Sequence, residues 1–135
     1  MAVIEEFRAN GGAVDEAAGG FFKGKPLLIL HHEGAKTGKR RMNPLVYADH
    51  DGTYVVAASR GGAPTHPDWL FNVRANPNVT VELGTETFPA TATVVADGPR
   101  RDELYAKLIA IMGQFADYET KTDRTIPVVV LERTG

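Results

Sequence analysis

The pattern of apolar and polar positions along this chain predicts several strands and few helices. Most apolar runs are four to eight residues long and end at glycine, proline or aspartate, which is typical of strands joined by turns. The pair Asp51-Gly52 between two such runs is a strong signal for a β-hairpin. The predicted strands cover residues 26–32, 42–48, 53–59, 78–83, 86–96 and 126–132.

Two helical segments are predicted in the first half of the chain. Residues 3–9 have the composition of a short helix, and the glycine- and alanine-rich stretch over 10–25 is predicted to be a loop. A second helix is expected to begin near His66, because Thr65 and Asp68 have the spacing of a capping box. It is expected to end at Asn76, which precedes a proline.

One long helix is predicted before the last strand. Asp97, Gly98 and Pro99 form its start signal. Apolar residues then recur at spacings of three and four, as on the buried face of an amphipathic helix. This predicted stripe consists of Leu104, Leu108, Ile111, Met112 and Phe115.

The order of these elements favours an antiparallel β architecture. Five or six strands with one short and one long helix are typical of a closed or nearly closed barrel, which also removes exposed sheet edges. The alternation of strand and helix that a doubly wound fold requires is absent. We expect one domain over residues 1–135, with 1–25 as an N-terminal helix and loop segment.

Composition narrows the function classes. The chain has 135 residues and a net charge of −2, so overall charge does not favour nucleic acid as a partner. It contains no cysteine, which excludes disulfides and thiolate chemistry. No apolar stretch reaches the roughly 18 residues of a membrane span. We expect a cytoplasmic protein, and the sequence leaves peripheral membrane contact and oligomeric state open.

A local basic segment stands out against this slightly acidic background. Between Glu33 and Arg41 the chain places two glycines, one threonine and the cations Lys36, Lys39 and Arg40. Backbone N–H groups and cationic side chains in such a loop suit an anionic group. A solvated basic hairpin loop explains the same residues equally well.

A second candidate loop follows the strand over 53–59. Ser59 ends that strand, and Arg60, Gly61 and Gly62 come next. Paired glycines allow the backbone to approach a ligand closely, and an arginine adds bidentate anion contacts. If the strands before the two basic loops are neighbours, the loops converge on one extended polyanion.

Aromatic residues supply candidates for a flat ligand. Trp69 and Asn72 lie three apart on the predicted short helix, hence on one face. Trp69 suits either a core position or ring stacking, and Asn72 can both donate and accept hydrogen bonds. On the long helix Tyr105, Phe115 and Tyr118 are candidates to line an apolar pocket, although most residues of such a stripe belong to a core.

Recognisable catalytic motifs are missing. The four histidines show no metal-ligand spacing, so no metal is assigned, and the GxSxG, P-loop and GxGxxG patterns do not occur. Redox or group-transfer chemistry would then have to come from a bound cofactor.

Three segments, GAKTGKRRMNPL, AASRGGAPTHPDWLFNVRANPNV and DYETKTDRTIPVVVLER, together resemble the deazaflavin-dependent nitroreductase family of actinobacteria. The resemblance runs from about Pro26 to the end of the chain. It implies a split β-barrel of the FMN-binding type that binds coenzyme F420, an 8-hydroxy-5-deazaflavin with a phosphate and a polyglutamate tail. It also implies hydride transfer from the reduced coenzyme to a small organic acceptor.

The resemblance assigns residues to three parts of that site. Matched residues in the basic loop would hold the phosphate and tail, those of the glycine loop would contact the deazaflavin and phosphate, and those of the short helix would lie beside the ring system. The implied coenzyme residues are Ala35, Lys36, Thr37, Arg41, Met42, Asn43 and Pro44; Ala57, Ala58, Ser59, Arg60, Gly61 and Gly62; and Asp68, Trp69, Leu70, Phe71 and Asn72.

The acceptor pocket departs from the family pattern. Nitroimidazole-reducing members carry tyrosines spaced by three before the TDRTIP motif, and here only Tyr118 is kept. Met112 and Phe115 occupy the two preceding positions. The phenolic proton donor at the middle position is therefore lost, which leaves nitroimidazole reduction open and does not affect deazaflavin binding.

The favoured function is therefore an F420H2-dependent reductase of a quinone or an activated alkene. Ser59, Tyr118 or water would deliver the proton, and the sequence does not decide among them. An FMN-dependent oxidoreductase is one alternative, although it explains the surplus of cations less well. A non-catalytic carrier of the coenzyme is another.

Overall fold

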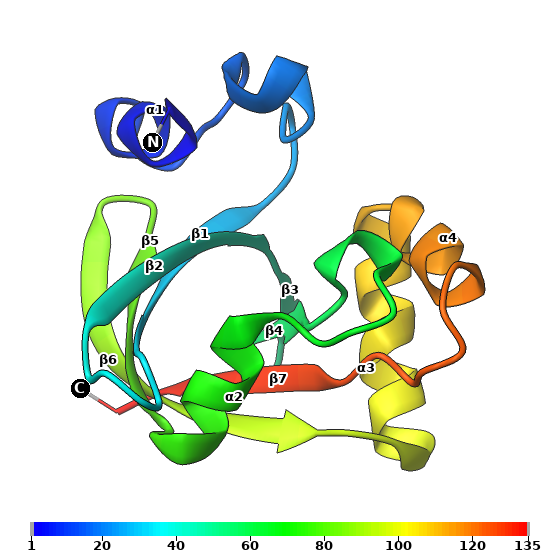
Figure 1. The fold of residues 1–135 in the computed structure, drawn as a ribbon. Helices are drawn as coiled ribbons and strands as arrows, with labels where there is room; N and C mark the ends of the chain where they lie inside the picture. The colour runs from blue at the N-terminus through cyan, green and yellow to red at the C-terminus, as the bar shows by residue number, and fades with distance from the viewer. Residues whose placement is uncertain (1, 135) are drawn as a thin grey trace.

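The computed structural model describes residues 2–134 (Figure 1). Its helices are α1 (Ala2–Ala9), α2 (Asp68–Ala75), α3 (Gly98–Ile111) and α4 (Gln114–Thr120), with short 3-10 turns η1 (Ala17–Gly20) and η2 (Arg60–Gly62). Its strands are β1 (Leu27–Glu33), β2 (Arg40–Val46), β3 (Ala48–His50), β4 (Thr53–Ala57), β5 (Asn78–Leu83), β6 (Glu86–Val95) and β7 (Val128–Arg133). Every predicted strand is present, within a few residues of its expected ends.

The strands form one curled antiparallel sheet in the order β2-β1-β5-β6-β7-β4-β3. Its two edge strands, β2 and β3, are separated in the chain by Tyr47 alone. The Tyr47 N–H donates to the carbonyl oxygen of Pro26 at 3.2 Å. Because a single residue joins the two edge strands in the chain, the sheet must curl until its two edges meet. The predicted mainly β, split-barrel architecture is confirmed.

Side chains of β1 alternate between two apolar clusters. Leu28 and Leu30 pack with α2 residues such as Leu70, whereas Leu27 and Ile29 pack with residues of α1 and α3. Both faces of β1 are therefore covered, and this explains why its sequence is a continuous apolar run instead of an alternating one.

The predicted N-terminal helix is confirmed as α1, and it is tied to the sheet. Arg8 donates to both carboxylate oxygens of Glu82 on β5, at 3.0 and 2.8 Å. His31 of β1 contacts the same carboxylate at 2.5 Å. The Glu6 carboxylate accepts backbone N–H groups from residues 15–17, which fixes the start of η1. Figure 1 shows α1 and η1 together above the curled sheet. The stretch over 10–25, predicted to be a loop, thus contains one short helical turn.

The predicted capping box of the short helix is wrong. Helix α2 begins at Asp68, and its N-cap residue is Pro67, which has no side chain able to cap. The Thr65 hydroxyl instead accepts a hydrogen bond from the Arg60 guanidinium at 2.6 Å. The Thr65 side chain, which the sequence assigned to a helix cap, therefore bonds to Arg60 of η2.

The predicted long helix is broken in two. At Met112 the backbone turns extended (φ −144°, ψ 107°), and α4 begins at Gln114 with Gly113 as its N-cap residue. The break changes which residues share a face: Met112 and Phe115 are buried, whereas Ile111 is 42% exposed. The sequence prediction assumed one regular helical period across residues 111–115. Gly113 lies in this range, and glycine is a poor helix former, so the helix does not continue through it.

The strand predicted over 42–48 also differs in detail. It begins earlier, at Arg40, and Tyr47 interrupts it at the bend between the two sheet edges. Within residues 2–134, no helix has both the length and the apolar composition needed to cross a membrane.

Candidate functional site

A groove formed by three adjoining hollows runs along one side of the molecule. The first hollow has a volume of about 300 Å³, the second about 240 Å³ and the third about 580 Å³. The first two share Asn43, Arg60 and Trp69 in their walls, and the last two share Arg41 and Asp68. Because neighbouring hollows have common walls, an elongated ligand can extend through all three.

Most of the residues that the sequence assigns to the site lie on this groove. In the first hollow are Asn43, Pro44, Ala57, Ser59, Arg60, Gly61, Trp69, Met112, Phe115 and Tyr118; in the second are Arg41, Asn43, Arg60, Asp68 and Trp69; in the third are Ala35, Lys36, Thr37, Arg41, Asp68, Phe71 and Asn72. Segments from four parts of the chain thus meet in one place.

Four of the predicted coenzyme residues line none of these hollows. Leu70 is fully buried in the core, and Ala58 is buried beneath the turn that follows β4. Met42, on β2, is partly exposed outside the groove walls. Gly62 is packed against α4: a Cβ there would lie 3.0 Å from the carbonyl oxygen of Tyr118. Leu70, Ala58 and Gly62 therefore pack beneath the groove without forming its surface.

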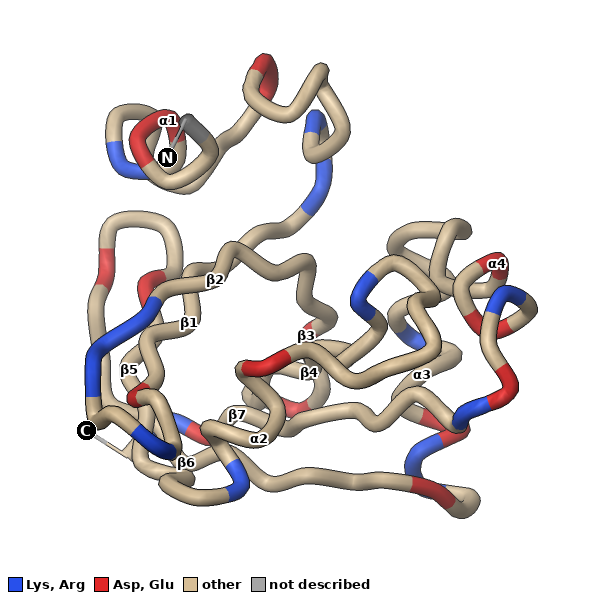
Figure 2. The backbone as a smooth tube through the Cα atoms, viewed as in Figure 1, with Lys and Arg blue, Asp and Glu red and all other residues tan. Residues whose placement is uncertain are grey.

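The two basic loops do converge, although not for the predicted reason. Strands β1 and β4 are not neighbours in the sheet. The loops meet because the sheet curls until its β2 edge lies beside its β3 edge, which brings Arg41 and Arg60 into the same hollow. Figure 2 shows the Lys and Arg colour concentrated along the start of β2 and the loop before it.

Charge and polarity change along the groove. The first hollow is walled mainly by apolar and aromatic side chains, with Arg60 at its boundary. Lys36 lines the third hollow, and Arg41 and Asp68 line both the second and the third. The arrangement suits a ligand with a flat apolar part at one end and negative charges along the other.

Aromatic packing fixes the wall of the first hollow. The Phe115 ring makes edge-to-face contacts with Tyr105, at a centroid distance of 6.0 Å, and with Tyr118, at 5.8 Å. Burial raises the pKa of Tyr118 above its ordinary value. Its phenol therefore keeps its proton at neutral pH and can donate a hydrogen bond into the hollow.

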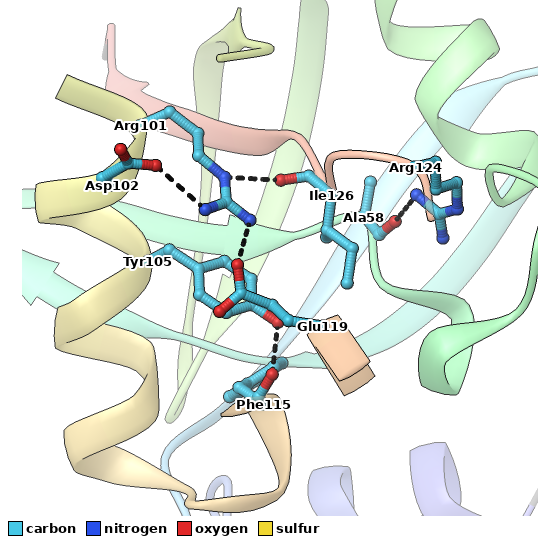
Figure 3. A network of polar contacts seen from close by, with 8 residues as sticks. All are labelled: Ala58, Arg101, Asp102, Tyr105, Phe115, Glu119, Arg124 and Ile126. Atoms are coloured by element: carbon cyan, nitrogen blue, oxygen red, sulfur yellow. Dashed lines mark hydrogen bonds and ion pairs between the residues drawn. The ribbon is translucent and has the colours of Figure 1, made fainter. Parts of the chain in front are cut away.

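Polar contacts hold α4 against α3 and the start of β7 (Figure 3). Buried Arg101 donates to the carbonyl oxygen of Ile126 at 2.9 Å and to the Glu119 carboxylate at 2.9 Å. The Tyr105 hydroxyl donates to the carbonyl oxygen of Phe115 at 2.6 Å. These bonds place Phe115, and hence Tyr118 one turn later, at the mouth of the first hollow.

A chain of hydrogen bonds positions the basic loop. The Ala35 N–H donates to Asn72 Oδ1 at 2.9 Å, and Asn72 Nδ2 lies 3.0 Å from His32 Nδ1. His32 Nε2 lies 2.7 Å from Asn43 Oδ1. The chain is satisfied when His32 is neutral and carries its proton on Nε2, and burial lowers the pKa of His32 in agreement. Both ends of the Asn72 amide are used inside the protein, so the contacts give this residue a positioning role.

Sequence reasoning missed several residues of the site. Phe21 and Phe22, from the stretch predicted to be a loop, line the first hollow. His32 lines the second hollow, and the sequence had marked it only as strand. Two adjacent phenylalanines in a glycine-rich segment were a usable signal, since apolar pairs are uncommon in solvated loops. Nothing in the local sequence indicated the role of His32.

The model of the F420H(2)-dependent quinone reductase family matches residues 3–133. This match spans the groove and the whole curled sheet. The chain belongs to the F420H(2)-dependent quinone reductase family. The resemblance inferred from the three sequence motifs is thereby confirmed.

Individual relatives agree with this membership. The F420H(2)-dependent quinone reductase Rv1261c of Mycobacterium tuberculosis is 40% identical over 113 residues, which cover 80% of this chain and 74% of that protein. A solved structure described as an F420-H2 dependent reductase is 41% identical, with a TM-score of 0.73 over 79% of this chain and 94% of that one. A pyridoxamine 5'-phosphate oxidase from Listeria innocua shares the fold at a TM-score of 0.59 and 12% identity, covering 82% of this chain and 85% of that one.

Proposed function

We propose that this protein is a reductase that binds reduced coenzyme F420 in the groove and passes hydride to a quinone. Family membership supports the reaction class, and the observation that carries the proposal is that an aromatic hollow adjoins two hollows that each contain two cations. An apolar hollow walled by Trp69 and Phe115 is continuous with a cationic one that contains Lys36. A deazaflavin ring with an anionic tail has the same distribution of polarity.

The residues present fit this coenzyme. Gly61 lines the first hollow with a left-handed φ of 64°, and a Cβ at this position would meet no protein atom within 4 Å. The backbone can therefore lie directly against a flat ring. Arg41 and Arg60 stand in the second hollow, between the apolar and the cationic ends. A phosphate that joins ring and tail would be held there.

The protein orients the reactants and excludes water. When bound, the reduced deazaflavin supplies the hydride, a chemistry that no side chain of this chain provides. Lys36, Arg41 and Arg60 hold the anionic arm, and this remote binding fixes the position of the ring in the first hollow. Phe115 and Met112 wall the remaining space, where the acceptor would bind.

Tyr118 is the proposed hydrogen-bond donor to the acceptor oxygen. Its phenol is protonated at neutral pH, burial raises its pKa further, and it lines the same hollow as Ser59. A donor aimed at the oxygen on which negative charge develops stabilises the transition state. The Ser59 hydroxyl is the second donor in reach of this hollow.

A direct spectrophotometric assay tests the function. Oxidation of reduced F420 by menadione, followed by absorbance, should be accelerated by the protein, and an unsaturated lactone and a nitroimidazole run in parallel define the range of acceptors. Titrations with F420 and with FMN identify the coenzyme. Tight F420 binding without turnover of any acceptor would instead indicate a carrier protein, and preferential FMN binding would overturn the proposal. Cytoplasmic residence stays a prediction from the sequence, which cell fractionation can test.

A further inference from the structure

Arg124 makes an unusual set of contacts with the turn after β4. It belongs to the segment between α4 and β7 and lines none of the three hollows. Its Nε donates to the carbonyl oxygen of Ala63 at 2.9 Å, and its Nη2 donates to that of Ser59 at 2.8 Å. Its Nη1 donates to the carbonyl oxygen of Ala58 at 3.2 Å (Figure 3). One guanidinium thus joins both ends of the turn.

The turn needs such support because its backbone is strained. Arg60, Gly61 and Gly62 have φ angles of 46°, 64° and 85°, so three consecutive residues are left-handed. A left-handed conformation is unfavourable for an arginine, and it persists only where surrounding contacts determine it. The three groove residues that this turn supplies, Ser59, Arg60 and Gly61, depend on that conformation.

The fourth contact of Arg124 is with a histidine. Arg124 Nη1 lies 2.9 Å from Nδ1 of His66, so the imidazole accepts the hydrogen bond and must be neutral at that nitrogen. The charged groups that act on His66 are Arg124 and Arg74 of α2, and the Phe71 ring of α2 packs against it edge-on. Burial, Arg124 and Arg74 all lower the pKa of His66.

We propose that Arg124 is a positioning residue that holds the turn over 58–63 in its coenzyme-binding conformation, with neutral His66 as its fourth acceptor. The predicted effect on coenzyme affinity rests on the proposed function. The clamp itself does not depend on that function. The planar guanidinium can direct several N–H groups at acceptors in different directions at once. A lysine ammonium is a point charge on a flexible stem, so Arg124→Lys keeps the charge and loses the clamp.

Hydrogen exchange on the coenzyme-free protein tests the clamp. The N–H groups of Gly62 and Ala63 are hydrogen-bonded within the turn, so they are protected when it is closed. In Arg124→Lys and Arg124→Gln, exchange of the peptide over 58–63 should be at least tenfold faster. Arg133→Lys is the matched control, because the Arg133 guanidinium also donates a hydrogen bond, to Glu86 of β6 at 2.9 Å, and lines none of the three hollows. Unchanged protection in the Arg124 variants, or an equal loss in the control, overturns the proposal.

Coenzyme titration gives the functional readout. Arg124→Lys should raise the Kd for F420 at least tenfold, whereas Arg133→Lys should leave it within about twofold. A wild-type protein that fails to bind F420 would refute the proposed function, while the exchange experiment would still decide the clamp. A Kd that is unchanged in Arg124→Lys would overturn the claim that the clamp controls coenzyme affinity.

A variant of His66 keeps the test decisive if the Arg124 variants do not fold. His66→Asn places an amide oxygen near the position of Nδ1 and does not titrate. Wild-type affinity should decline as the pH falls below the ordinary histidine pKa of about 6.5 and through the lower folded-state value, because protonated His66 cannot accept the hydrogen bond and repels Arg124. His66→Asn should bind normally at neutral pH with a smaller acid decline. Identical pH profiles for the two proteins would overturn the role given to His66.

Discussion

Replacing Gly62 by alanine tests how closely the turn after β4 packs against α4. An added Cβ would lie 3.0 Å from the carbonyl oxygen of Tyr118, 3.1 Å from its Cα and 3.0 Å from the Cβ of Lys121. Two of these three neighbours are backbone atoms and the third is a Cβ attached directly to the backbone, so none can rotate away. The substitution must therefore push η2 and α4 apart.

The expected cost has two parts. Alanine in the left-handed conformation at φ 85° costs about 1–2 kcal/mol, and overpacking a close contact adds about 1–3 kcal/mol. Lower chain entropy in the unfolded state returns about 0.4–1 kcal/mol. The free energy of unfolding should thus fall by about 2–4 kcal/mol, which for a chain of this size lowers the Tm by roughly 10 °C.

Gly52→Ala is the matched control. Gly52 has φ 83°, almost the same as Gly62, but a Cβ there would meet nothing within 4 Å. Both variants pay the same backbone cost, and only Gly62→Ala has the steric clash. Thermal unfolding followed by circular dichroism should show a Tm loss for Gly62→Ala that exceeds the control by at least 5 °C. Equal losses would mean that the turn and α4 are not in rigid contact, and the reasoning would fail.

Three further predictions concern the groove. Lys36→Ala combined with Arg60→Ala should weaken F420 binding about 10- to 100-fold in a fluorescence titration, and this loss should be smaller at high salt. The control, Arg100→Ala combined with Lys107→Ala on α3, should leave F420 binding unchanged. Tyr118→Phe should lower kcat for menadione by about 10- to 100-fold and leave the Kd for F420 within about twofold, so an equal loss in both would contradict a donor role. Because the pKa of buried His32 is lowered, its contribution to stability is fully present above its ordinary pKa of about 6.5 and is lost as the pH falls through the lower folded-state value. Urea unfolding at pH 7.5 and 5 should therefore show a smaller acid loss in His32→Asn than in the wild type.

Strand positions could be predicted from the sequence because they depend on local patterns. The apolar run over 26–32 and the turn at Asp51-Gly52 are sufficient to locate β1 and β4. The basic and glycine-rich loops were recognisable as site segments for a similar reason: charge, backbone freedom and motif spacing are properties of neighbouring residues. Most of the residues chosen on that basis line the groove.

Contacts between segments distant in sequence were decided by the tertiary structure. The sequence indicates that Arg41 and Arg60 are cations in loops, but only the curl of the sheet through Tyr47 brings them into one hollow. Likewise, Arg124 and Gly62 show no local sign of their partners, because a hydrogen bond to a distant carbonyl or a close backbone contact leaves no periodicity in the chain. Local propensity determined the elements of this protein, and long-range packing determined which of their side chains form a site.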